Sequence, residues 1–101
     1  MEDDQIKSGD LIAWPPADFD MPLRAPVSLG GETYDSLSLR EPTGDEWEKI
    51  LAVPEAQRRR KAVSLVAGVP MGACALMGIG DLVRAEAYLN SFFETGQLIG
   101  V

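Results

Sequence analysis

The stretch VSLGGETYDSLSLREPTGDE, residues 27–46, constrains the fold more than any other part of the chain. Two runs that alternate apolar and polar residues flank Gly30 and Gly31, and a pair of glycines supplies the positive φ angles that a two-residue hairpin turn requires. The sequence therefore predicts a β-hairpin with strands at residues 24–29 and 32–40. Because a hairpin of two strands is only marginally stable alone, it has to pack against other elements.

The alternation in the second predicted strand breaks at Tyr34. Leu37 and Leu39 alternate with polar residues, as expected for a strand with one buried face. Tyr34 is out of phase with both leucines. Two explanations are open: a bulge near Asp35 resets the register, or Tyr34 packs on the opposite face of the hairpin.

The hairpin leads directly into a helix. Pro42 ends the second strand, and Thr43-Gly-Asp-Glu46 matches a capping box. In this motif the threonine hydroxyl accepts a hydrogen bond from the glutamate amide, and the glutamate carboxylate bonds back to the threonine amide. Five residues of this stretch are expected to have structural roles: Gly30, Gly31, Pro42, Thr43 and Glu46.

The second half of the chain shows helical periodicity interrupted by glycine and proline. The predicted helices cover residues 44–52, 55–67, 69–77 and 81–94. Gly96 is expected to end the last of them. The sequence thus predicts an α+β fold, in which an N-terminal β-hairpin packs on a small bundle of three to four helices and a flexible acidic arm precedes both.

The chain is expected to divide into an arm, one domain and a short tail. Residues 1–23 hold six acidic residues and three prolines without a period of 2 or 3.6, which predicts a flexible acidic arm. Residues 24–96 form the single α+β domain, and residues 97–101 a frayed C-terminus. Because the arm also contains Trp14 and Phe19, two hypotheses are open: a mobile tail, or a segment that docks.

Charge argues against nucleic acid as a partner. The formal net charge is -7, and an acidic surface repels phosphate backbones. The basic run at residues 58–61 is the exception. Four consecutive residues on a helix spread around the whole cylinder, so the run is best explained as a solvated helix face.

The chain lacks the residues that mark catalysis or metal binding. It contains no histidine and a single cysteine, Cys74, which lies in an apolar run and is expected to be a buried structural thiol. Its carboxylates lie at predicted turns and helix N-termini, where capping explains them. We therefore expect a protein that is not an enzyme and has no catalytic residue, metal or cofactor.

The sequence also predicts a protein of the reducing cytoplasm. A lone cysteine forms no intramolecular disulfide, and Met-Glu-Asp-Asp at the N-terminus has the wrong charge for a signal peptide. The apolar stretch at residues 63–79 is interrupted by Pro70 and several glycines, so no membrane association is expected.

Binding is the function that this composition favours. Methionines in a glycine-loosened apolar segment suit contact with varied partner helices, although the same residues can simply fill the core. The candidate partner-binding residues are Leu65, Val66, Met71, Leu76, Met77, Ile79, Leu82, Leu89, Phe92 and Phe93.

Part of the sequence resembles a known family. Residues 27–34 and the run Leu37-Ser-Leu-Arg-Glu-Pro-Thr43 are similar to the opening of the small tail assembly chaperones of long-tailed bacteriophages, especially the Mu-like type. Residues 65–70 and the helix at residues 81–93 resemble the C-terminal half of that family.

The resemblance implies a non-enzymatic chaperone in the host cytoplasm. Such chaperones bind the tape measure protein and keep it soluble until tail tube subunits polymerise around it, and they are absent from the mature virion. The resemblance also implies a homo-oligomer, with tail tube protein as a further partner.

Two other functions stay open at this point. One is a small acidic adaptor or regulatory protein that binds a host or phage protein through the N-terminal arm. The other is a small helical DNA-binding domain that uses residues 58–61, although the net charge of -7 argues against it.

Overall fold

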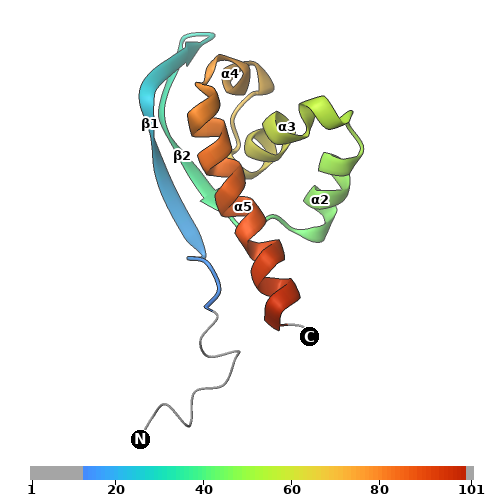
Figure 1. Cartoon of the computed structure of the whole chain (residues 1–101). Coiled ribbons are helices and arrows are strands. Elements are labelled where there is room, and N and C mark those ends of the chain that lie inside the picture. The colour runs from blue at the N-terminus through green and yellow to red at the C-terminus, as the bar shows by residue number, and fades with distance from the viewer. Residues whose placement is uncertain (1–12, 100–101) are drawn as a thin grey trace, which may run out of the picture.

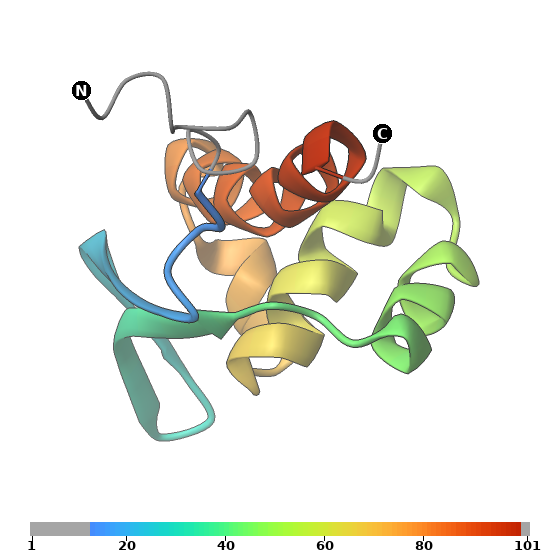
Figure 2. The same cartoon turned by 90° about the horizontal axis from the view of Figure 1, so that it is seen from below.

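The structure, a computed structural model, describes residues 13–99. Within them an antiparallel hairpin is followed by four helices, which confirms the predicted α+β class (Figure 1). The elements are β1 (Asp18–Leu29), β2 (Glu32–Arg40), α2 (Gly44–Leu51), α3 (Glu55–Ala67), α4 (Met71–Leu76) and α5 (Ile79–Ile99). Helix α3 contacts β2 and α5, and α4 contacts β1, so the helices gather on one face of the hairpin (Figure 2).

The hairpin closes on Gly30 and Gly31 as predicted, with φ angles of 60° and 83°. Strand β1, however, begins at Asp18 and not at Arg24. Residues 18–23, which the sequence analysis assigned to the arm, pair with β2. Residues 1–12 of the expected arm lie outside the described residues.

The early start of β1 has a physical cause in the alternation of its residues. Phe19, Met21 and Leu23 point toward the helices, and Met21 is fully buried. Pro22 lies between them and is exposed, which is tolerated because β1 is an edge strand. Acidic residues and prolines hid this period-2 pattern in the sequence.

A bulge explains the position of Tyr34. Residues 23–26 of β1 stand opposite Asp35 alone, because Pro22 pairs with Ser36 and the next pair is Val27 with Tyr34. The first of the two explanations is therefore confirmed, although the extra residues lie in β1. Tyr34 is half-buried and packs against the core beside Val27.

The helix boundaries agree with prediction at α3 and differ at α5. Helix α3 ends at Ala67 and is capped by Gly68, which has a left-handed φ of 70°. Helix α5 begins before Asp81 and continues through Gly96 to Ile99. A single helical glycine costs only about 1 kcal/mol relative to alanine, which packing of the neighbouring Thr95 can offset. Residues 97–99 are thus helical, and residues 100–101 lie outside the described residues.

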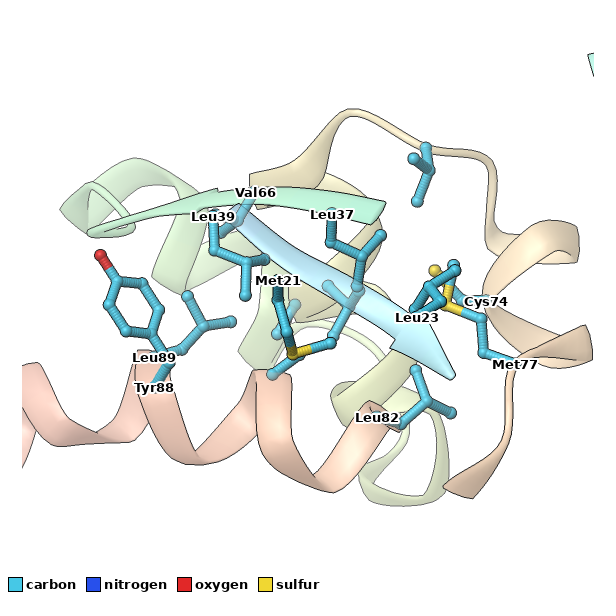
Figure 3. Packing of buried hydrophobic residues seen from close by; sticks show 14 of the residues in the cluster. Met21, Leu23, Leu37, Leu39, Val66, Cys74, Met77, Leu82, Tyr88 and Leu89 are labelled. Atoms are coloured by element: carbon cyan, nitrogen blue, oxygen red, sulfur yellow. The ribbon is translucent and has the colours of Figure 1, made fainter. Parts of the chain in front are cut away.

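The core lies between the inner face of the hairpin and the helices. In Figure 3, Met21, Leu37 and Leu39 of the hairpin face Cys74 of α4 and Leu89 of α5. Burial of these side chains is the main force that orders the marginal hairpin. No helix among the described residues combines the length and apolarity needed to cross a bilayer.

Candidate binding surfaces

The candidate partner-binding residues separate into core and surface groups. Five are buried in the core, where no partner reaches them in this conformation: Val66, Met77, Leu82, Leu89 and Phe92. Leu65 and Met71 are half-buried. Leu76, Ile79 and Phe93 are exposed by 58%, 64% and 39%. Only the last group is open to a partner, together with exposed apolar residues that the sequence analysis did not select.

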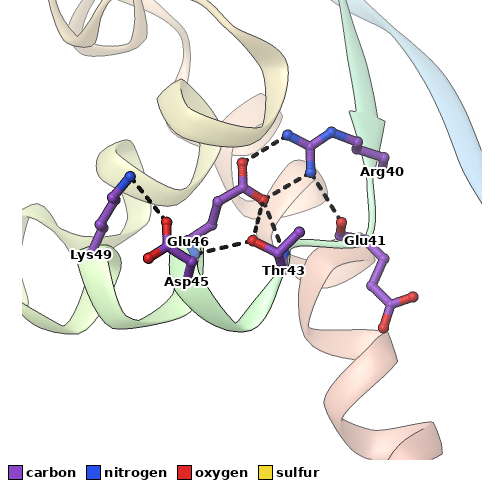
Figure 4. Close-up of polar contacts among 6 residues, drawn as sticks. All are labelled: Arg40, Glu41, Thr43, Asp45, Glu46 and Lys49. Atoms are coloured by element: carbon purple, nitrogen blue, oxygen red, sulfur yellow. Dashed lines mark hydrogen bonds and ion pairs between the residues drawn. The ribbon is translucent and has the colours of Figure 1, made fainter.

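The entry to α2 is fixed by a polar network around Glu46 (Figure 4). Arg40 at the end of β2 donates to both carboxylate oxygens of Glu46, at 2.9 and 2.7 Å. The capping box is present as predicted: the Thr43 amide donates to Glu46 at 2.9 Å, and the Glu46 amide donates to the Thr43 hydroxyl at 3.2 Å. The hydrogen bond from Arg40, followed by that from the Thr43 amide, lowers the pKa of Glu46 to about 2. This network sets the direction of α2 relative to the hairpin.

Helix α2 leaves two hollows between itself and α5. The first has a volume of about 460 Å³ and contains Trp14, Glu41 and Gln97 in its wall. The second, about 540 Å³, extends toward α3. Trp47 and Phe93 line both hollows, and their ring centroids lie 4.5 Å apart. The two hollows together are called the α2–α5 groove below.

A second apolar surface lies at the other end of α5. Leu76 at the end of α4 and Ile79 and Val83 in the first turns of α5 are exposed by 58%, 64% and 44%. This set is called the α4–α5 patch. The patch ends at Val83, and the wall of the groove on α5 begins at Glu86, three residues further along the helix.

The described part of the arm docks on α5. The Tyr88 hydroxyl donates a hydrogen bond to the Pro16 carbonyl oxygen. Burial, followed by the negative charges of Asp18 and Glu41, raises the pKa of Tyr88. The Trp14 ring lies over Gly96, whose Cβ position would be 3.7 Å from it. This part of the chain therefore forms one wall of the groove.

Asp81 has a structural role that sequence analysis did not find. Its carboxylate accepts hydrogen bonds from the backbone amide and Nε of Arg24, at 3.1 and 3.0 Å, and from Arg84 at 3.2 Å. Burial alone would raise the pKa of Asp81, but the contacts with Arg24 and the charge of Arg84 outweigh it and lower the pKa. Gly78 and Gly80 leave room for the Arg24 guanidinium. Asp81 thus ties the β1 bulge to the start of α5, across 57 residues of sequence.

The basic run on α3 is engaged in contacts within the chain. Arg58 donates to the carbonyl oxygens of Val53 and Leu51 at the end of α2. Arg59 forms an ion pair with Glu86 at 2.7 Å. These contacts account structurally for Arg58 and Arg59, two of the four basic residues at positions 58–61.

The described residues offer little for covalent or metal chemistry. Cys74 is fully buried, and this burial, opposed in part by the charge of Arg60, raises the pKa of its thiol to about 11. Between residues 13 and 99, no group of three or more Cys, Asp or Glu side chains is placed to hold a metal ion. What the surface does offer is apolar contact at the groove and the patch.

Comparison with protein families identifies the chain. No curated protein and no solved structure matches it significantly. A family model described as "Phage tail assembly chaperone proteins, E, or 41 or 14" matches residues 20–94. The match begins inside β1 and ends inside α5; it includes the α4–α5 patch and most of the α2–α5 groove, but not Trp14 or Gln97. Because it covers well over half of the chain, the protein belongs to the phage tail assembly chaperone family.

Proposed function

We propose that the chain binds the tape measure protein of its phage and keeps it soluble during tail assembly. It acts without catalysis in the host cytoplasm, as a homo-oligomer, and leaves before the virion is complete. Tail tube protein is a further partner in this proposal. A chaperone of a tail protein works while the tail is being built in the host, which supports the proposed site of action.

The family match is the observation that carries the proposal. The surface supports it, because a chaperone for amphipathic helices needs apolar hollows on a charged, soluble exterior. The α2–α5 groove and the α4–α5 patch provide the apolar part. The net charge of -7 provides the repulsion that keeps chaperone molecules from aggregating.

Co-expression with the tape measure protein tests the proposal. The full chain is produced with the tape measure protein of the same phage, and the soluble fraction is compared with expression of the tape measure protein alone. We expect more soluble tape measure protein and its co-purification with the chain. No gain in solubility together with no co-purification would overturn the proposal.

A deletion separates the chaperone from an adaptor that works through the N-terminal arm. Residues 18–23 belong to β1, and Trp14 and Pro16 contact α5, so the deletion stops at residue 12 to leave these contacts intact. A chaperone that binds through its helices keeps its partner after this deletion. An adaptor that binds through the arm loses it.

A further inference from the structure

We propose that the α2–α5 groove binds one amphipathic helix whose apolar stripe is flanked by basic residues. This inference rests on the proposed function, for which it names the class of segment recognised in the client protein.

The groove has the shape of a helix-binding site. The residues of its α5 wall that a partner can reach include Glu86, Asn90, Phe93 and Gln97. These positions follow one another at three- and four-residue spacing, so they share one face of the helix. They span about 17 Å, or three helical turns, which is the length over which a partner helix presents several anchor residues.

The apolar anchors lie on the two walls of the groove, one on α5 and one on α2. Phe93 of α5 is 39% exposed and Leu51 of α2 is 44% exposed. Trp47 is half-buried and packs at a tilt against Phe93, so each ring restricts the other before any partner arrives. An aromatic pair restricted in this way in an apolar groove loses little side-chain entropy on binding, which is typical of binding hot spots.

The side chains that line the groove carry more negative than positive charges, with Glu41, Glu55 and Glu86 against Arg58 and Arg59. Arg59 is paired with Glu86, whereas Arg58 donates to the backbone carbonyl oxygens of Leu51 and Val53 and keeps its positive charge. Glu41 in the first hollow and Glu55 in the second form no salt bridge within residues 13–99. A partner with lysine or arginine beside its apolar stripe would pair with these carboxylates, whereas an acidic partner would be repelled.

Two synthetic peptides of about 18 residues test the charge preference, since this length suffices for a helix stabilised by packing. Both carry the same leucine and alanine stripe, and their polar faces contain lysine in one and glutamate in the other. Binding to the full chain is measured by isothermal titration calorimetry at 0.15 M salt. We expect the lysine peptide to bind about tenfold or more tightly than the glutamate peptide. Equal affinities would overturn the proposal.

Charge variants distinguish the groove from general attraction to an acidic protein. The double variant Glu41→Gln, Glu55→Gln removes two charges at the groove, and Glu32→Gln, Asp35→Asn removes two on the exposed hairpin. We expect the groove variant to weaken binding of the lysine peptide about fivefold and the hairpin variant to change it less than about twofold. Equal losses would show that net charge alone attracts the peptide and would overturn the proposal.

Substitutions of exposed apolar residues test whether the peptide binds at the groove or at the α4–α5 patch. Phe93→Ala is expected to weaken binding of the lysine peptide about tenfold, and Leu76→Ala in the α4–α5 patch less than about twofold. Circular dichroism confirms that each variant is folded. A larger loss for Leu76→Ala than for Phe93→Ala would overturn the proposal.

The two proposals fail in different ways. If the wild-type chain keeps the tape measure protein soluble and the groove variants bind the lysine peptide like wild type, the groove inference is wrong and the chaperone function stands. If the groove binds the peptide as expected and the wild-type chain gives the tape measure protein no protection, the helix site stands and the proposed client is wrong.

Discussion

Glu46 connects three parts of the molecule through one carboxylate. It accepts hydrogen bonds from Arg40 at the end of β2 and from the amide of Thr43, and it lies in the first turn of α2. The capping box was predictable because all of its partners lie within four residues. The hydrogen bonds from Arg40 were not predictable from the sequence. The Arg40 guanidinium reaches the helix only because β2 ends in the right direction, and the fold as a whole determines that direction.

The Glu46→Gln variant is expected to lose about 1–2 kcal/mol of stability at pH 7, after allowance for screening by solvent. The pKa of Glu46 is about 2 in the folded chain against an ordinary value of 4.5. A lowered folded pKa means that the carboxylate stabilises the fold fully above pH 4.5 and loses this effect as the pH falls toward 2. Urea unfolding of both proteins at pH 7, 4 and 2.5 measures the difference, which should shrink at each step. A difference independent of pH would contradict this account.

Cys74 is expected to react slowly while the chain is folded. Its thiol is fully buried and has a pKa of about 11, so few molecules carry the reactive thiolate near neutral pH. We expect modification by Ellman's reagent at pH 8 to be about 100-fold slower or more in the native protein than in guanidinium chloride. Equal rates would mean that α4 does not cover the thiol.

At the scale of helices and strands, the features that depend on residues close in sequence were predicted, and those that depend on distant residues were missed. The turn at Gly30 and Gly31 and the span of α3 follow from residues close in sequence, and both agree with the structure. The start of β1 was missed because its pairing with residues 36–40 is long-range and its alternation is masked by proline and aspartate. The role of Asp81 depends on Arg24, far away in sequence, so no local pattern could indicate it.

Gly96 and Gly31 differ in backbone conformation, so replacing each with alanine tests helix α5 and the hairpin turn separately. Gly96 lies inside α5, and a Cβ there would be 3.7 Å from the Trp14 ring, an ordinary contact distance. Gly96→Ala should therefore stabilise the chain by about 0.5–1 kcal/mol. Gly31 has a φ of 83°, so Gly31→Ala should destabilise it by about 1–2 kcal/mol. Chemical unfolding measures both changes, and a loss of stability for Gly96→Ala would argue against a helix that continues to Ile99.

At the scale of the whole molecule, α5 joins the core and both apolar surfaces. One of its faces packs on the hairpin, its first turns contribute to the α4–α5 patch, and its last turns form a wall of the groove. The sequence indicated apolar residues along α5 but could not separate Leu89 and Phe92 in the core from Phe93 on the surface. That separation depends on where the hairpin and α2 pack, which only the assembled fold determines.

The central claim is that the chain holds a helical segment of its client in the α2–α5 groove. Hydrogen–deuterium exchange of the full chain, alone and in complex with the co-expressed tape measure protein, tests it most directly. The account predicts slower exchange on binding in α2 and in residues 86–97 of α5, with little change in α4 and the first turns of α5. Slower exchange confined to α4 and residues 79–83, with α2 unchanged, would contradict it.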